Sequence, residues 1–291
     1  MNRFDYARED TGNLVLLEHL NLTIPDQRAA TAFYVSGLGL TRDPYLMTGV
    51  TNMWINVGRS QIHLPHGDAQ RLRGHVGLIV GERQSLVERL RAVQPLLDGT
   101  AFGWTERDDR VEVNCPWGNR YDCLDPETYR QNAAGPAIDL GMAYVQLDVP
   151  AGCARSIAAF YREMFNAPVE LLDDGGLQQA VIAIGTYQQL IYAETLEANP
   201  EYDGHHIQVY VSNFSGPYAR LAERGLVYGE EPHQYRFATL IDPESGADCF
   251  KLEHEVRSLH HPLYARPLVN RNPDQGNRNY RKGGDRRNGV F

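Results

Sequence analysis

The sequence predicts an α+β fold built from four modules of the form β-α-β-β-β. Three observations lead to this prediction: the length of the chain, an internal repeat, and an alternation of apolar and polar residues at the start of each repeated segment. With 291 residues, the chain is long enough for two domains of ordinary size. A composition of 42% hydrophobic and 22% charged residues is that of a globular protein.

The repeat relates the second half of the chain to the first. His19–Leu40 matches Tyr144–Ala167, since each reads as a strand, a proline and a helix that contains Ala-Phe-Tyr. His75–Val93 matches His206–Leu226, likewise a strand followed by a helix. The order A-B-A-B indicates a duplicated half, and each half consists of two units of roughly sixty residues.

Each of the four segments begins with a strand that is half buried. In the first, Leu20, Leu22 and Ile24 point to one side, while His19 and Asn21 point to the other. The apolar side needs a cover, and the helix that follows each strand supplies it. Shorter strand-like runs separated by Gly and Pro complete each module.

We expect three regions along the chain: a first pair of modules in residues 1–135, a second pair in residues 136–262, and a polar tail in residues 263–291. The small residues and the proline of Ala133–Gly141 suggest a linker between the pairs. From Arg266 onward the sequence has seven basic and two acidic residues, in a chain of net charge −9. We expect this tail to be flexible or to cover the acidic domains, with binding to an anionic partner as the alternative.

Several classes of protein are excluded by the sequence. No apolar run approaches the ~20 residues of a membrane-spanning helix, and the first residues lack the pattern of a secretory signal. Four cysteines without a C-x-x-C pair predict reduced thiols, so we expect a cytoplasmic protein. The negative charge argues against nucleic-acid binding, and the motifs of phosphate-binding loops, dinucleotide-binding folds and nucleophile elbows are absent.

The modules resemble a known superfamily. The sequence pattern that carries the resemblance is His19, Pro25-Asp26, Ala32-Phe33-Tyr34 and Leu38-Gly39 in the first module, and Pro116-Trp117-Gly118-Asn119-Arg120-Tyr121-Asp122 at the end of the second. It resembles the vicinal oxygen chelate superfamily, which includes glyoxalase I, the bleomycin and fosfomycin resistance proteins, methylmalonyl-CoA epimerase and type I extradiol dioxygenases. The resemblance covers about residues 14 to 255. It implies that paired modules form two cup-shaped, half-barrel sheets with the helices outside, and that a cup holds a divalent metal.

By this resemblance, the metal ligands are the opening residue of each first strand and one residue of each last strand. In the first half these positions hold His19, His63, His75 and Asp122, all on the polar faces of their strands. Imidazole and carboxylate ligands suit one divalent transition metal. Fe(II) or Mn(II) is favoured, and Zn(II), Ni(II) or Co(II) is also compatible.

The second half offers another candidate site. The same correspondence gives Tyr144, His206 and roughly Leu190, and alternation along the last strand places Glu253 in the cup. A site of His206 and Glu253, with Gln146 or Tyr144, is the possibility that results. His233 and Tyr235 could line this cup. A second half kept only for packing or substrate binding is the alternative.

Three functions follow from the resemblance, and the residues leave all three open. The favoured one is a metal-dependent oxidoreductase of the extradiol-dioxygenase type, because four modules in one chain are similar to the layout of those enzymes. The second is a glyoxalase-like lyase, isomerase or epimerase, and the third is a non-catalytic protein that binds an antibiotic-like molecule. The expected partner is a small molecule with adjacent oxygen atoms, and the chain could form a homo-oligomer.

Overall fold

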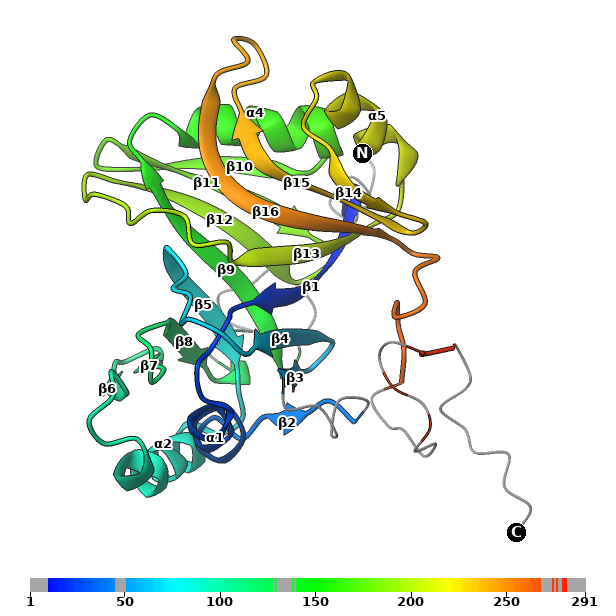
Figure 1. Ribbon diagram of the computed structural model, residues 1–291. Coiled ribbons are helices and arrows are strands. Elements are labelled where there is room, and N and C mark those ends of the chain that lie inside the picture. The colour runs from blue at the N-terminus through cyan, green and yellow to red at the C-terminus, as the bar shows by residue number, and fades with distance from the viewer. Residues whose placement is uncertain are drawn as a thin grey trace, which may run out of the picture.

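The computed structural model describes residues 10–44, 51–127, 129, 138, 140–267, 274, 276 and 279–281. It contains two eight-stranded mixed sheets, each built from two modules (Figure 1). We name the modules by their strands: module 1 is β1–β4, module 2 is β5–β8, module 3 is β9–β12 and module 4 is β13–β16. The predicted α+β architecture of four β-α-β-β-β modules in two paired sheets is confirmed.

The first sheet combines modules 1 and 4 in the order β14-β15-β16-β13-β1-β4-β3-β2. Its central contact is the antiparallel pairing of β1 with β13, and each of these strands pairs in parallel with the last strand of its own module. The strands are β1 (Leu14–Asn21), β2 (Thr41–Arg42), β3 (Asn52–Val57), β4 (Ser60–Pro65), β13 (His206–Val211), β14 (Tyr228–Glu231), β15 (Gln234–Ile241) and β16 (Asp248–Ser258).

The second sheet combines modules 2 and 3 in the order β10-β11-β12-β9-β5-β8-β7-β6. Here β5 and β9 are the central antiparallel pair. The strands are β5 (Gly74–Ile79), β6 (Gly103–Glu106), β7 (Val111–Asn114), β8 (Arg120–Leu124), β9 (Gly141–Pro150), β10 (Val169–Asp174), β11 (Leu177–Ile184) and β12 (Gln188–Thr195).

This pairing of modules differs from the one that the repeat predicts. We expected modules 1 and 2 to share a cup, with His19 and His75 opening neighbouring strands. That expectation is wrong, because His19 lies in the first sheet and His75 in the second. Alternation along a strand determines which face is buried but does not specify the partner strand, so a repeat of four similar modules leaves the pairing open.

The helices cover the convex faces of the sheets, outside the two cups. The helices whose bounds lie within the described residues are α1 (Gln27–Ala30) with the π-helical segment η2 (Thr31–Gly37), α2 (Arg83–Val93) with the 3₁₀ turn η3 (Gln94–Leu96), α4 (Ala154–Phe165), and α5 (Ser215–Glu223). Asp26 begins the first helix, since its carboxylate accepts the backbone N–H groups of Arg28 and Ala29. On α4, Ile157, Phe160 and Met164 form part of a stripe that is fully buried.

Modules 1 and 2 meet through their helices, as do modules 3 and 4, although the strands of each of these pairs belong to different sheets. Figure 1 shows α1 and α2 together at one end of the molecule and α4 and α5 together at the other. The Tyr34 hydroxyl of module 1 lies 2.6 Å from the Tyr121 hydroxyl of module 2, and both rings are fully buried. One continuous hydrophobic core therefore joins the two sheets.

Parts of the predicted linker and tail can also be located. Most of Ala133–Gly141 and of the residues after 267 lie outside the described residues. Arg266, which the sequence placed in the polar tail, is instead buried and forms an ion pair with Asp43.

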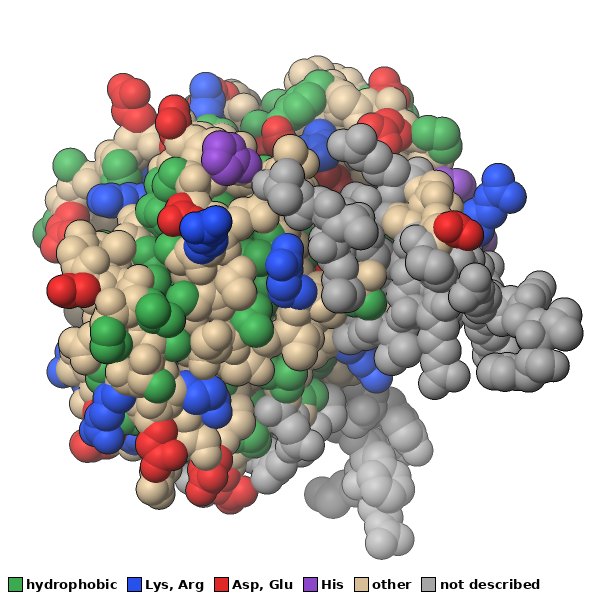
Figure 2. Space-filling view, turned by 60° about the horizontal axis from the view of Figure 1, so that its bottom comes forward, with side chains coloured by type: hydrophobic (Ala, Val, Ile, Leu, Met, Phe, Trp, Pro, Cys, Tyr) green, Lys and Arg blue, Asp and Glu red, His purple; other side chains and the backbone are tan. Residues whose placement is uncertain are grey.

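The surface charges and the lengths of the helices can also be compared with the expectations from the sequence. Acidic and basic side chains are interspersed on the face seen in Figure 2. In the described part of the chain, no helix is both long and apolar enough to cross a membrane.

Candidate metal centre

The centre begins at a β-bulge in β1. Leu17 pairs with Val209 and His19 with Gln208, so Glu18 is an extra residue with no partner across the strand. Neighbours in a regular strand point to opposite faces, whereas a bulge can turn both to one side. Oε2 of Glu18 consequently lies 2.7 Å from Nδ1 of His19, and both residues are buried.

His63 of β4 lies against His19. The two rings stack with their centroids 3.8 Å apart, and Trp54 stacks on the other face of His63 at 3.9 Å. Nε2 of His63 donates to Oε1 of Gln61 at 2.9 Å. The orientation of the Gln61 amide is fixed, because its nitrogen donates to Asp43.

These hydrogen bonds fix the imidazole tautomers. Burial raises the pKa of Glu18, and the charges of Arg257 and Arg266 oppose this effect. As a carboxylate, Glu18 accepts from His19, which then carries its proton on Nδ1; the amide oxygen of Gln61 accepts from His63, which carries its proton on Nε2. The other nitrogen of each ring keeps a lone pair. A metal-binding histidine is oriented in the same way by a carboxylate or carbonyl on its far nitrogen.

Module 4 contributes His206 from β13 and Glu255 from β16. The His206 ring lies edge-on to His19, with the centroids 5.6 Å apart. One ligand atom from each of His19, His206 and Glu255 lies within 4.8 Å of the others. Glu18, His19 and His63 form a second such group, and both groups found among the described residues share His19.

The histidines of this cluster are held in the neutral form. Burial lowers the pKa of His19 and of His63 well below the usual value, and the nearby charge of Arg257 adds to the effect. Burial lowers the pKa of His206 to about 4. Neutral imidazole is the form that binds metal ions, so the cluster offers its lone pairs at neutral pH.

Two arginines hold the carboxylates of module 4. Glu255 forms ion pairs with Arg236 and Arg257, and Glu253 forms one with Arg236. Glu253 also lies 3.6 Å from Nδ1 of His206. Although burial alone would raise the pKa of Glu253, contacts led by the Tyr228 hydrogen bond lower it, so this group remains a carboxylate.

Gln208 tests whether the cluster fits a bound group. It pairs with His19 across the strands and is fully buried, yet neither its amide nitrogen nor its amide oxygen has a hydrogen-bond partner. Leaving a buried amide unpaired is costly, so a polar group that completes the site is expected beside it. An ion with its water ligands meets that requirement, and the donors of the cluster fit a divalent transition metal.

The second cup has a different arrangement. Oδ2 of Asp122 accepts a hydrogen bond of 2.8 Å from the Tyr144 hydroxyl and lies 3.4 Å from both Nε2 of His75 and Nε of Arg110. The Tyr144 ring lies across Gly77, where an added Cβ would approach its Cε1 to 2.2 Å. The Asp122 carboxylate is thus held by protein donors, and among the described residues no three ligand atoms converge around it as they do around His19.

The predicted ligands are therefore divided between the cups. His19 and His63 lie together, and they are joined by His206 and Glu253 from the predicted second-half site. The other members lie in the second cup: His75, Asp122, Tyr144 and Gln146. The strand faces were predicted correctly, but the grouping followed from the wrong pairing of modules.

His233 and Tyr235 are outside both cups. His233 is exposed in the turn between β14 and β15. Tyr235 is buried on the helix side of β15, where its ring packs against Phe214 and Tyr218. Arg236, the residue between Tyr235 and Phe237, is the one that faces the cup.

Sequence reasoning missed Glu18, Gln208 and Glu255. Glu255 follows Glu253 at the two-residue spacing of one strand face, so alternation could have identified it. Glu18 is marked by a break in alternation, since Leu16-Leu17 is followed by Glu18-His19. Such a break is the sequence signal of a bulge.

The fold and this cluster define a protein of the vicinal oxygen chelate fold with a candidate 2-His-1-carboxylate centre. Among solved structures, a point mutant of glyoxalase I from Zea mays is similar, with a TM-score of 0.59, 12% identity, and coverage of 87% of this chain and 95% of that one. A Bacillus subtilis protein described as a candidate dioxygenase has a TM-score of 0.58, 11% identity, and coverage of 89% and 88%. The CppA protein of Streptococcus pneumoniae has a TM-score of 0.50, 9% identity, and coverage of 85% and 99%.

These similarities confirm the resemblance at the level of the fold. No protein-family model and no curated protein matches the sequence.

Proposed function

We propose that the chain is a divalent-metal-dependent enzyme that acts on a small molecule with adjacent oxygen atoms. The observation that carries the proposal is the convergence of His19, His206 and Glu255, whose ligand atoms lie within 4.8 Å of one another. Two imidazoles and one carboxylate form the ligand set that leaves positions open for substrate and oxygen in non-haem Fe(II) enzymes. We therefore favour an oxygen-dependent reaction with Fe(II) or Mn(II).

The surrounding residues support this assignment. When bound, the metal would act as a Lewis acid that stabilises negative charge on the substrate oxygens. Glu18 orients His19, Arg236 and Arg257 neutralise Glu255, and the unpaired Gln208 amide can donate to or accept from a bound group. Burial of His19 and Gln208 keeps bulk water out of the centre.

A lyase or isomerase reaction is the second candidate, and Glu253 is the observation that favours it. Its carboxylate lies beside His206 and is half buried rather than enclosed. A carboxylate placed next to a metal centre can take a proton from the substrate and return it. Zn(II), Ni(II) or Co(II) would suffice for that chemistry, because the metal undergoes no redox change.

The first experiment measures metal content. Protein purified without chelator should contain about one divalent ion per chain by elemental analysis, and His206→Ala should lose most of it. His75→Ala is the matched control, because His75 is also a strand histidine beside a carboxylate but lies in the other cup. Equal metal content in wild type and His206→Ala, or a loss in His75→Ala alone, would reject the proposed centre.

The second experiment separates the two reactions. Fe(II)-loaded protein should consume oxygen with substrates that carry adjacent oxygen atoms, and Glu253→Gln should retain this activity. Equal turnover without oxygen, supported by Zn(II) or Ni(II) and abolished in Glu253→Gln, would favour the isomerase or lyase.

A further inference from the structure

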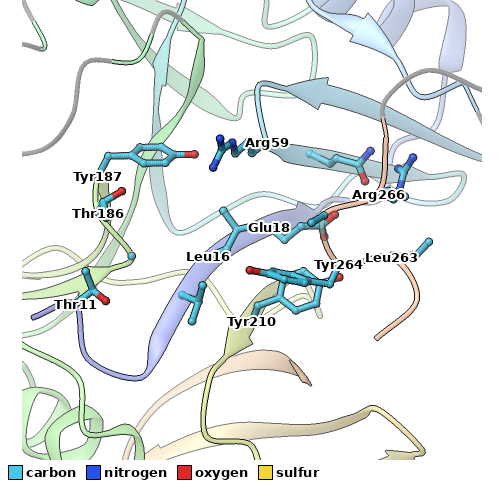
Figure 3. A pocket seen from close by; sticks show the side chains of 14 residues that line it. Thr11, Leu16, Glu18, Arg59, Thr186, Tyr187, Tyr210, Leu263, Tyr264 and Arg266 are labelled. Atoms are coloured by element: carbon cyan, nitrogen blue, oxygen red, sulfur yellow. The ribbon is translucent and has the colours of Figure 1, made fainter. Parts of the chain in front are cut away.

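A cavity of about 590 Å³ lies beside the metal centre. It is bounded by β1, by the turn between β11 and β12, and by residues 263–266 after the last strand (Figure 3). Neither His19, His206 nor Glu255 lines it. Glu18 separates the cavity from the imidazoles, because its side chain reaches the cavity and also contacts His19.

Aromatic and aliphatic side chains form most of the wall. The rings of Tyr210 and Tyr264 pack edge to face with centroids 4.8 Å apart, and Tyr187 lies across the cavity from them (Figure 3). Val15 and Leu16 add apolar surface from β1. A cavity of this size with such walls suits a flat molecule of one or two rings.

Three charged side chains line the cavity, Glu18, Arg59 and Arg266, and the last of these is paired with the Asp43 carboxylate. Glu18 is buried, with a relative exposure of 7%, and can accept hydrogen bonds but not donate them when ionised. Arg59 is exposed and lies beside Tyr187 at the side opposite Tyr264 (Figure 3). A ligand therefore meets an acceptor at the inner end and a cation near solvent.

The wall that carries Tyr264 is fixed in place. Arg266, two residues further on, forms a buried ion pair with Asp43, and Asp43 also accepts from Gln61 of β4. Tyr264 is thus anchored to module 1 by its neighbour and to module 4 by Tyr210. A preformed wall binds a ligand without first having to be ordered.

We infer that this cavity is a binding site for a flat aromatic anion that carries a hydrogen-bond donor. The rings lie between Tyr187 and the Tyr210–Tyr264 pair, the donor meets Glu18, and the anionic group meets Arg59. The site does not depend on the metal, because none of the three proposed ligands lines it. It places the bound molecule one hydrogen bond away from His19.

The probe for this site is 4-aminonaphthalene-1-sulfonate, a flat, fluorescent two-ring molecule that carries an N–H donor at one end and a sulfonate at the other. In fluorescence titrations of EDTA-treated protein it should bind saturably with one site per chain. Leu16→Trp, which fills the cavity, should weaken binding at least about tenfold, and Arg59→Gln should weaken it about three- to tenfold. Arg155→Gln is the matched control, because Arg155 is exposed on α4 and does not line the cavity.

Displacement of the probe by two small sulfonates tests whether the ligand needs an N–H donor. 4-Aminobenzenesulfonate should displace the probe about tenfold better than 4-methylbenzenesulfonate, which has the same shape but no N–H, and Glu18→Gln should reduce this difference. Saturable binding that is unchanged in both Leu16→Trp and Arg59→Gln, or no saturable binding at all, would overturn the inference. Because the protein is free of metal in this experiment, a failure here is distinct from a failure of the proposed metal centre.

Discussion

Glu18 and His19 are neighbours in the sequence, yet their side chains meet in the same cup at 2.7 Å because a bulge interrupts β1. The carboxylate accepts the Nδ1 proton, which leaves the lone pair of the ring on Nε2. A regular strand would place Glu18 on the helix side, where a carboxylate would be buried among apolar residues. The bulge therefore determines how the imidazole is presented.

Replacing Glu18 should weaken metal binding without unfolding the protein. Glu18→Leu keeps the volume and removes the acceptor, so His19 can rotate and change tautomer. We expect metal affinity to fall by about 10- to 100-fold, the usual effect of losing such a partner. Competition with a chromophoric chelator measures the metal affinity. Glu223→Leu, on the exposed side of α5, is the control. Unchanged affinity in Glu18→Leu would contradict the proposed orienting role of Glu18.

Gly77 should be intolerant of a side chain. An added Cβ would overlap the Tyr144 ring, so the ring must move and its hydrogen bond to Asp122 must break. We expect Gly77→Ala to lower the free energy of unfolding by about 2–3 kcal/mol, as for overpacking at other buried positions. Urea denaturation measures the change. Gly81→Ala is the control, because nothing lies within 4 Å of its added Cβ, and similar losses in both variants would refute the steric explanation.

The sequence predicts the strand faces well because period-two alternation is a local property. Asn21 and His63, Gly77 and Asp122, and Gln146 and His75 all lie on the faces that alternation assigns to them. The grouping of His75 with His19 could not be predicted, since it depends on which module supplies the neighbouring strand. That choice is made by contacts between segments far apart in the chain, such as β1 with β13.

Other parts of the site depend on departures from regular structure. Arg266 lies in a polar, basic segment whose composition predicts exposure, but a specific partner, Asp43, buries it. Tyr235 was expected to line the cup but lies on the apolar face of β15. In both cases the position of the side chain depends on a contact that this one residue makes, and composition and spacing do not describe such contacts.

The buried histidines should make metal-free protein less stable as the pH falls. The pKa of His206 is about 4 in the folded state and its ordinary value is 6.5, so the unfolded chain binds a proton that the folded chain does not. The contribution of neutral His206 to the free energy of unfolding is fully present above pH 6.5 and is lost progressively as the pH falls toward 4. Titration of His206 can lower the free energy of unfolding by up to about 3 kcal/mol, with a slope of about 1.4 kcal/mol per pH unit.

Urea unfolding of EDTA-treated protein between about pH 4 and pH 7 measures this loss. His206→Gln should show a shallower dependence on pH, because the titrating group is gone. His233→Gln is the control, since His233 is exposed in a turn. A slope that is the same in wild type and His206→Gln would assign the pH dependence to other groups.

The buried ion pair between Arg266 and Asp43 gives the final prediction. Arg266→Met removes the guanidinium but keeps an apolar stem, so the Asp43 carboxylate stays buried without this cation, while the Gln61 amide still donates to it. Removing one partner of a buried pair costs about 3–5 kcal/mol, whereas replacing both costs much less. We therefore expect a marked fall in thermal and urea stability for Arg266→Met and a partial recovery in the double variant with Asp43→Asn. An additive loss in the double variant would show that the two side chains stabilise the fold independently.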